Sequence, residues 1–280
     1  MSNDINQDIA KELVAQTAGK VYDDLMHPAA QATGQIISFL PRTVRVWLSK
    51  WEKWILNGEY AIKETEVLLA EKLKHIPEEN LVEPEPYVAV PALQQLSYSL
   101  DSEALRELYA NLLASSMNID TKGLVHPSFV DIIKQLTPDE AKLLNYIYNQ
   151  ANRGIAIIDV EMRIDGGKNG VLSLLKSFSN VYDDILDDPD HYLVCIDNLL
   201  RLNLCIIPTH HYVDQTLYEP ILNHPKYTQD PTVITLNKVE TYNVENSDSK
   251  ANLKVDKLIL ELTDYGKAFS NVCLTTEEFL

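Results

Sequence analysis

The chain has 280 residues, 45% of them hydrophobic and 23% charged, so it can bury a substantial core and is not broadly disordered. Its formal net charge of −17 disfavours duplex DNA as a partner, because a DNA-binding protein needs Lys and Arg to neutralise phosphates. Cys195, Cys205 and Cys273 are widely spaced and form no CxxC pair, which argues against a disulfide framework or a zinc knuckle and favours reduced thiols.

Through the first 75 residues, apolar side chains recur at the three- and four-residue spacing of amphipathic helices. Pro28 and Pro41 interrupt this pattern, and Pro41 suits the first position of a helix, where a missing amide hydrogen costs little. Asn57-Gly58 is expected to end that helix. The pattern predicts helices over 4–25, 28–39, 41–56 and 59–75.

Residues 83–91, EPEPYVAVP, contain three prolines in nine positions. Each proline lacks an amide hydrogen and disfavours helical geometry in the residue before it. We therefore expect an extended strap between two helical groups. The strap also contains Tyr87, Val88 and Val90, so it is expected to pack rather than to act as a loose linker.

Helices are predicted next over 91–99, 102–118 and 127–135. Thr137-Pro138-Asp139-Glu140 then predicts a further helix start. A threonine cap, a proline at the first helical position and a glutamate at the third satisfy the free amides and suit the helix dipole.

The remainder of the chain mixes strand and helix patterns. A glycine-rich run, 166–170, is interpreted as a turn before a helix; the alternative, a phosphate cradle, lacks the P-loop spacing. Thr263 is expected to cap the last helix. The patterns predict strands at 155–160, 204–208, 233–242 and 255–262, and helices at 171–178, 192–202 and 264–272.

This order of elements suits a winged helix-turn-helix variant. The sequence therefore predicts a mainly α (α+β) protein with an N-terminal helical domain, residues 1–124, and a C-terminal winged-helix-like domain with a small β-sheet, residues 125–280. The N-terminus has no secretory signal, and no stretch reaches the roughly 18 apolar residues of a membrane-spanning helix, so a cytoplasmic location is expected.

Several stretches within residues 8–145 resemble the abortive-infection alpha (Abi-alpha) family, bacterial domains associated with phage defence. The stretches are DIAKELV (8–14), EKWIL (52–56), LLAEKLKHIP (68–77), EPEPYVAVPALQ (83–94), LRELYANLLASSMN (105–118) and VHPSFVDIIKQLTPDEAKLL (125–144). The resemblance implies a role in phage defence. It implies no catalytic residue.

The most informative stretch is residues 25–56, which we call the basic tryptophan segment. Its one acid is Glu52, although acids make up 41 of the 280 residues. The segment contains all three tryptophans of the chain and four cations. These residues are Trp47, Trp51, Trp54, Arg42, Arg45, Lys50 and Lys53.

At about 100° per residue, the three tryptophans fall within roughly 60° of one another, and Leu40 and Val44 extend their face. The cations cluster on the opposite face. Such a helix suits the interface of an anionic membrane or a groove on an acidic partner. The alternative is structural: the tryptophans pack into the core, and the cations meet the protein's own acidic surface.

Other clusters receive a structural interpretation. Asp183–Asp190 contains five aspartates but lacks the glycine turn and terminal glutamate of an EF-hand loop, so it is expected to be a solvated acidic loop. His191 and Cys195, with Cys205, His210 and His211, match no standard zinc spacing. We therefore assign no catalytic residue, no metal site and no cofactor.

Three functional hypotheses follow. The first is a non-enzymatic antiphage defence protein, acting through a protein partner or homo-oligomer, or through peripheral contact of the basic tryptophan segment with the inner membrane. The second is a nuclease or nucleotide hydrolase that uses Asp183–Asp190 with a divalent ion. The third is a DNA-binding regulator, which is disfavoured because residues 192–203 carry a single cation, Arg201.

Overall fold

A computed structural model describes residues 44, 46, 68–99, 102–150, 154–166, 170–208, 214–228, 236–245 and 249–274. The helices predicted before residue 57 lie outside these ranges, apart from Val44 and Val46, which are both helical. Residues 68–73 are also helical, as the pattern over 59–75 predicts. Among the described residues, no helix is long and apolar enough to cross a membrane.

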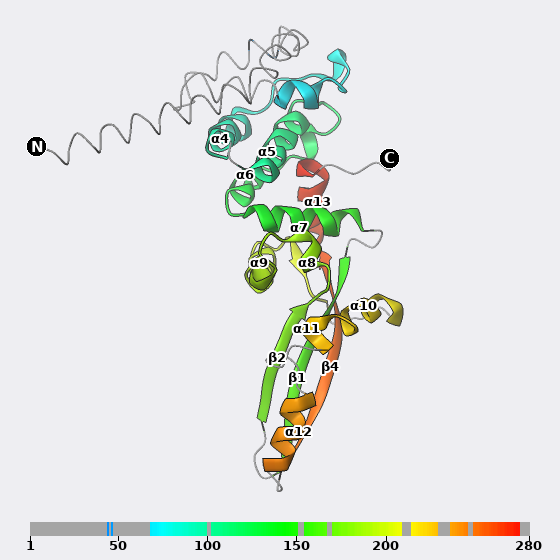
Figure 1. Ribbon diagram of the computed structural model, residues 1–280. Helices are drawn as coiled ribbons and strands as arrows, with labels where there is room; N and C mark the ends of the chain where they lie inside the picture. Colours follow the sequence, from blue (N-terminus) through cyan, green and yellow to red (C-terminus); the bar gives the residue numbers. More distant parts are fainter. Residues whose placement is uncertain are drawn as a thin grey trace, which may run out of the picture.

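The described elements form a helical head from which a β-sheet arm extends (Figure 1). The head consists of α4 (Pro86–Tyr98), α5 (Glu103–Ser116), α6 (Ser128–Ile133), α7 (Pro138–Asn149) and α13 (Asp264–Cys273). The arm consists of β1 (Gly154–Gly166), β2 (Gly170–Phe178), β4 (Ser249–Leu262) and α12 (Leu236–Glu245).

Shorter elements lie where the head meets the arm or connect the larger ones. They are η2 (Glu78–Asn80), η3 (Lys122–Leu124), α8 (Tyr182–Ile185), η4 (Pro189–His191), α9 (Tyr192–Arg201), β3 (Cys205–Ile206), η5 (Gln215–Tyr218), α10 (Glu219–Leu222) and α11 (Pro225–Thr228).

The prediction of an extended strap over 83–91 is wrong, because helix α4 begins at Pro86. Pro86 occupies the first turn, where its missing amide hydrogen has no partner to lose, and Pro91 lies inside the helix at the cost of one hydrogen bond. Burial of Val88 in the core offsets that cost, whereas Tyr87 remains 62% exposed.

The predicted cap of α7 is confirmed. The Thr137 hydroxyl accepts from the Glu140 amide at 3.2 Å, and the Glu140 carboxylate accepts from the Thr137 amide at 2.7 Å. The Thr263 cap is also confirmed, since its hydroxyl accepts from the Gly266 amide at 2.8 Å. Both motifs could be predicted because each is complete within four residues.

The sheet has four antiparallel strands in the order β2-β1-β4-β3. The central strands β1 and β4 pair from Gly154↔Glu261 to Gly166↔Ser249, which makes them much longer than the predicted 155–160 and 255–262. β3 pairs with only the last two residues of β4. This sheet and the helical head confirm a mainly α protein of the α+β class.

Two predicted elements have the opposite structure. Residues 171–178 belong to strand β2 rather than to a helix, and residues 236–245 form helix α12 rather than a strand. The glycine-rich run 166–170 therefore connects two strands and precedes no helix. A short apolar run cannot be assigned from periodicity alone, and pairing or packing with neighbours decides its structure. The winged-helix arrangement is accordingly not confirmed.

The last helix returns to the head and packs on α5 and α7. The Asn111 side-chain amide of α5 donates to the Cys273 carbonyl at 3.0 Å, and the Ser115 hydroxyl donates to the Val272 carbonyl at 3.0 Å. Buried residues from both sides of residue 124 belong to one core cluster. The division into domains 1–124 and 125–280 stays a prediction.

Candidate functional site

The residues predicted to form the functional surface lie outside the described part of the chain: Arg42, Arg45, Trp47, Lys50, Trp51, Lys53 and Trp54. Val44 and Val46 are described within the same segment. Val44 is fully buried in the core, whereas Val46 is 45% exposed. Residues two apart on a helix point in roughly opposite directions, so Val44 faces the core and Val46 faces away from it.

Val44 lies on the face that the sequence assigns to the tryptophans. Val44 and Trp51 are seven residues apart, which on a regular helix places them within about 20° of each other. A regular helix through these residues would place the tryptophan face on the same side as the buried Val44 side chain.

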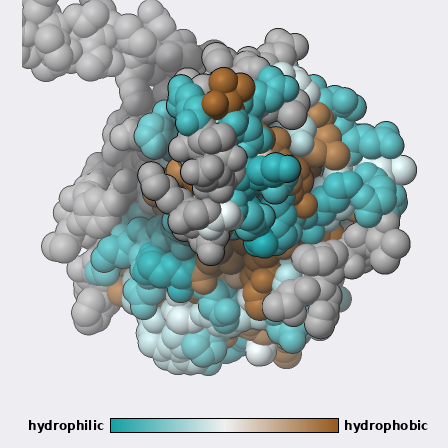
Figure 2. Space-filling model, turned by 90° about the horizontal axis from the view of Figure 1, so that it is seen from below, coloured by the Kyte–Doolittle hydropathy of each residue, from teal (hydrophilic) through white to brown (hydrophobic). Residues whose placement is uncertain are grey.

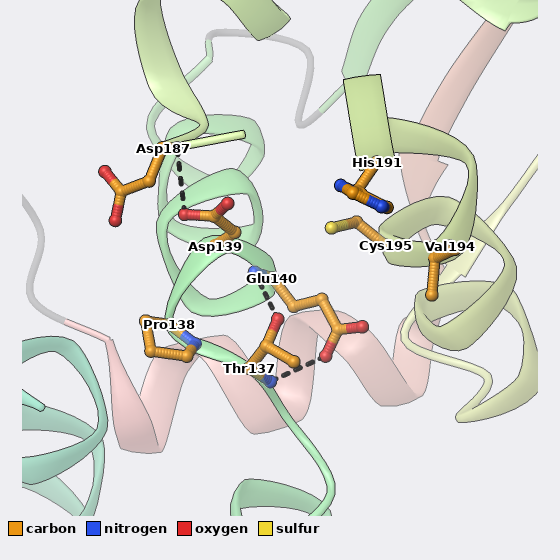
Figure 3. A pocket seen from close by; sticks show the side chains of 8 residues that line it. All are labelled: Thr137, Pro138, Asp139, Glu140, Asp187, His191, Val194 and Cys195. Carbon is orange, nitrogen blue, oxygen red and sulfur yellow. Dashed lines mark hydrogen bonds between the residues drawn. The ribbon is translucent and has the colours of Figure 1, made fainter. Parts of the chain in front are cut away.

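Within the described residues, a hollow of about 360 Å³ lies where the first turn of α7 meets the loop after α8 and the start of α9 (Figure 3). In the sequence its residues belong to separate motifs, the helix start at Thr137, the aspartate run and the His191–Cys195 pair. The hollow is lined by Thr137, Pro138, Asp139, Glu140, Asp187, His191, Val194 and Cys195.

The carboxylates of this hollow are already paired. Asp139 accepts the amide hydrogens of Asp187 at 3.0 Å and Asp188 at 3.3 Å. The Lys142 ammonium lies 2.5 Å from an Asp187 oxygen and 3.7 Å from an Asp139 oxygen, and this pairing raises the pKa of Lys142. These contacts anchor the acidic loop to the first turn of α7.

Three further aspartates of the run have side-chain partners. Asp183 accepts from His224 at 3.0 Å, Asp188 contacts His191 at 2.6 Å, and Asp190 contacts Lys226 at 2.6 Å. No group of three or more His, Cys, Asp or Glu side chains in the described ranges is arranged to hold a metal ion. Asp183–Asp190 is thus an exposed acidic surface loop, as expected, and four of its five aspartates also have side-chain partners.

Glu140 joins the hollow to a second network that the sequence did not indicate. Its carboxylate, 1% exposed, also accepts from the Asn198 side chain at 2.8 Å. Asn198 donates in addition to the Gln135 carbonyl, and Arg201 donates to the side chains of both Gln135 and Asn198. Arg201, the lone cation of α9, therefore fastens α9 to the junction of α6 and α7.

His191 and Cys195 both border the hollow, as their four-residue spacing predicts (Figure 3). Cys205 is buried in β3, and His210 and His211 lie outside the described residues. Burial raises the pKa of the Cys195 thiol to about 11, so at neutral pH it is protonated and a poor nucleophile. Burial likewise raises the pKa of Cys205 to about 12.

The raised pKa values of Cys195 and Cys205 predict that the free energy of unfolding falls at alkaline pH. Their pKa values are higher in the folded chain than the ordinary value of 9.0, so the folded state holds the protons more tightly. The contribution of the protonated thiols to the free energy of unfolding is complete below about pH 9 and is lost as the pH rises toward about 12. Urea unfolding at increasing pH should show the decline, and Cys205→Ala should make it shallower. Equal stability at pH 7 and pH 11 would contradict the assignment.

Together these features define a class: an α+β protein with a helical head, a protruding antiparallel arm and polar side chains paired with one another at the junction. The profile of the family described as "Abortive infection alpha" matches residues 57–273, most of the chain. The chain therefore belongs to the abortive infection alpha family. The match omits residues 8–56, where the resemblance was also expected, and includes the C-terminal half.

Comparison with solved structures finds an uncharacterized protein from the hydrocarbon-degrading marine bacterium Alcanivorax borkumensis SK2. The two are 16% identical, the alignment covers 56% of this chain and 96% of the other, and the TM-score is 0.30. No curated protein matches the chain.

Proposed function

We propose that this protein acts in abortive-infection-type antiphage defence, and that its output is a contact made by the basic tryptophan segment rather than a catalysed reaction. The observation that carries the proposal is the family match over residues 57–273. The paired carboxylates at the hollow and the protonated Cys195 thiol support a non-enzymatic role, because they offer neither a base nor a nucleophile.

The burial of Val44 supports a resting state in which the segment is held against the head. A trigger that releases the basic tryptophan segment would expose an apolar helix face with three indoles and an opposite face with four cations. Indoles favour the membrane interface, and each cation near an anionic surface contributes about 1 kcal/mol. Four cations would therefore strengthen binding by roughly three orders of magnitude. The cytoplasmic leaflet of the inner membrane is the proposed target, with an acidic protein as the alternative.

Vesicle binding tests the proposal. The quadruple variant Arg42→Glu, Arg45→Glu, Lys50→Glu and Lys53→Glu should lose co-sedimentation with vesicles rich in phosphatidylglycerol, because repulsion replaces attraction. The matched control makes the same charge change at Arg163, Lys176, Lys254 and Lys267, whose side chains are each at least 41% exposed. The control should bind as the wild type does.

Phage challenge of a bacterial host is the cellular counterpart of this experiment. The quadruple variant should lose protection and the control should keep it. Protection retained by the quadruple variant, with unchanged vesicle binding, would remove the membrane proposal. Loss of protection in Asp187→Asn with Asp188→Asn, at unchanged stability, would instead favour a hydrolase that uses those carboxylates.

A further inference from the structure

The two edges of the sheet differ in how far other elements hydrogen-bond to them. At the far end of the arm, the Asn243 side chain of α12 bonds to β4, accepting from the Ala251 amide at 2.6 Å and donating to the Ala251 carbonyl at 3.2 Å. Asn243 thus occupies the place of a neighbouring strand. At the near end β3 pairs with β4. Covering an edge in this way prevents pairing with another chain.

Among the described residues, the opposite edge, formed by β2, is covered only near the head. The Tyr192 hydroxyl donates to the Lys176 carbonyl at 2.9 Å, and the Tyr182 hydroxyl donates to the Ser177 carbonyl at 2.9 Å. From Gly170 to Leu175, no side chain in the described ranges bonds to the outer backbone of β2. Gly170–Ser173 is exposed on both faces, with Val171 62% and Leu172 47% exposed.

Charge distinguishes this edge from the rest of the molecule. Residues 170–175, GVLSLL, contain no charged side chain. Around them, 161–166 and 249–257 carry three acids and four bases, in a chain whose net charge is −17. Seen from the far end of the arm, the surface shows small hydrophobic patches among hydrophilic residues (Figure 2). The charges around this edge nearly cancel, so like-charge repulsion between two copies is small here.

From this geometry we infer that the β2 edge pairs with the β2 edge of a second copy of this chain, antiparallel about a two-fold axis near Ser173. Such a contact is self-complementary, since each copy offers the same donors and acceptors in reverse order. About this axis, Val171 would lie opposite Leu175 of the second copy and Leu172 opposite Leu174, so these apolar side chains would shield one another from water, and no charge would be buried. An acidic peptide gains no such advantage, because the edge offers it no cation.

The contact is short, so the association should be weak. A standard interface buries about 1,600 Å² in total, and six residues a side bury less, which is typical of dissociation constants in the micromolar range or above. The inference names a surface and a partner that the proposed defence role does not require, and it stands independently of that role.

Cross-linking tests the geometry. All three native cysteines are buried, so an engineered cysteine supplies the reactive thiol. Ser173→Cys should form a covalent dimer with a short bismaleimide, because the two-fold axis brings both thiols together. Val244→Cys, at an 85% exposed position on the same arm, is the matched control and should remain a monomer. Equal dimer yields from the two variants would overturn the proposed register and axis.

Sedimentation equilibrium of the full chain tests the energetics. The pair Val171→Lys and Leu172→Lys places like charges across the axis and should raise the dimer dissociation constant at least about tenfold. The control pair, Leu217→Lys and Val244→Lys, makes the same chemical change at exposed positions away from this edge. A wild type that stays monomeric through the high micromolar range, or a dimer unaffected by the β2 pair, would overturn the inference.

Discussion

Gly266→Ala should destabilise the protein by about 3 kcal/mol or prevent folding, because the added methyl group has no space. A Cβ at this position in α13 would lie 1.9 Å from the Leu204 carbonyl oxygen and 2.8 Å from its carbon. That carbonyl is fixed by the Thr263 amide, which donates to it at 3.0 Å. Both clashing segments are backbone, so a side-chain rotation gives no relief. Urea unfolding measures the loss.

Gly123→Ala is the matched control, since a Cβ there meets nothing within 4 Å. Its free energy of unfolding should lie within about 1 kcal/mol of the wild-type value, and the lower entropy of its unfolded chain should raise it slightly. If Gly266→Ala were as stable as Gly123→Ala, the close approach of α13 to the turn after α9 would be wrong.

Glu140→Ala should cost about 3 kcal/mol, because it removes a buried carboxylate that serves two elements at once. The Thr137 amide and the Asn198 side chain would each lose a part-buried bond to this carboxylate, and a hydrogen bond to a charged group contributes about 1.5–3 kcal/mol. Since Asn198 belongs to α9, amide hydrogen exchange in α9 should accelerate along with that of the first turn of α7.

Two further variants isolate this effect. Glu140→Gln keeps an acceptor oxygen and should fall between the wild type and Glu140→Ala. Glu103→Ala removes an exposed glutamate from the first turn of α5 and should cost less than about 1 kcal/mol. Similar losses for Glu103→Ala and Glu140→Ala would show that only the helix dipole matters and that the link to α9 contributes nothing.

Features that depend on residues within one helical turn could be predicted from the sequence, whereas features that depend on distant residues could not. Thr137 and Thr263 were assigned correctly because a cap and its partners lie within one helical turn. β2 was assigned wrongly because its structure depends on β1, whose pairing places Leu172 opposite Met162. α4 was predicted only from residue 91, and its first five residues were missed because the penalty of Pro91 is offset by burial against residues distant in sequence.

At the candidate site, too, the local features could be predicted from the sequence and the long-range contacts could not. The spacing of His191 and Cys195 predicted that they share one surface. The contacts of Asn198 and Arg201 with Gln135 could not be predicted, because they join residues more than sixty positions apart. Nor could the burial of Val44, since helical periodicity identifies an apolar face without showing what covers it.

Intrinsic fluorescence tests the central claim most directly, because the only tryptophans, Trp47, Trp51 and Trp54, lie in the basic tryptophan segment. If the segment inserts into the interface of an anionic membrane, vesicles rich in phosphatidylglycerol should change the emission, and brominated lipid should quench it. Vesicles of phosphatidylcholine alone should do neither, because they offer the four cations no counter-charge. Emission that remains unchanged with anionic vesicles and unquenched by brominated lipid, even after the chain has been incubated with an extract of phage-infected cells and purified again, would contradict the account.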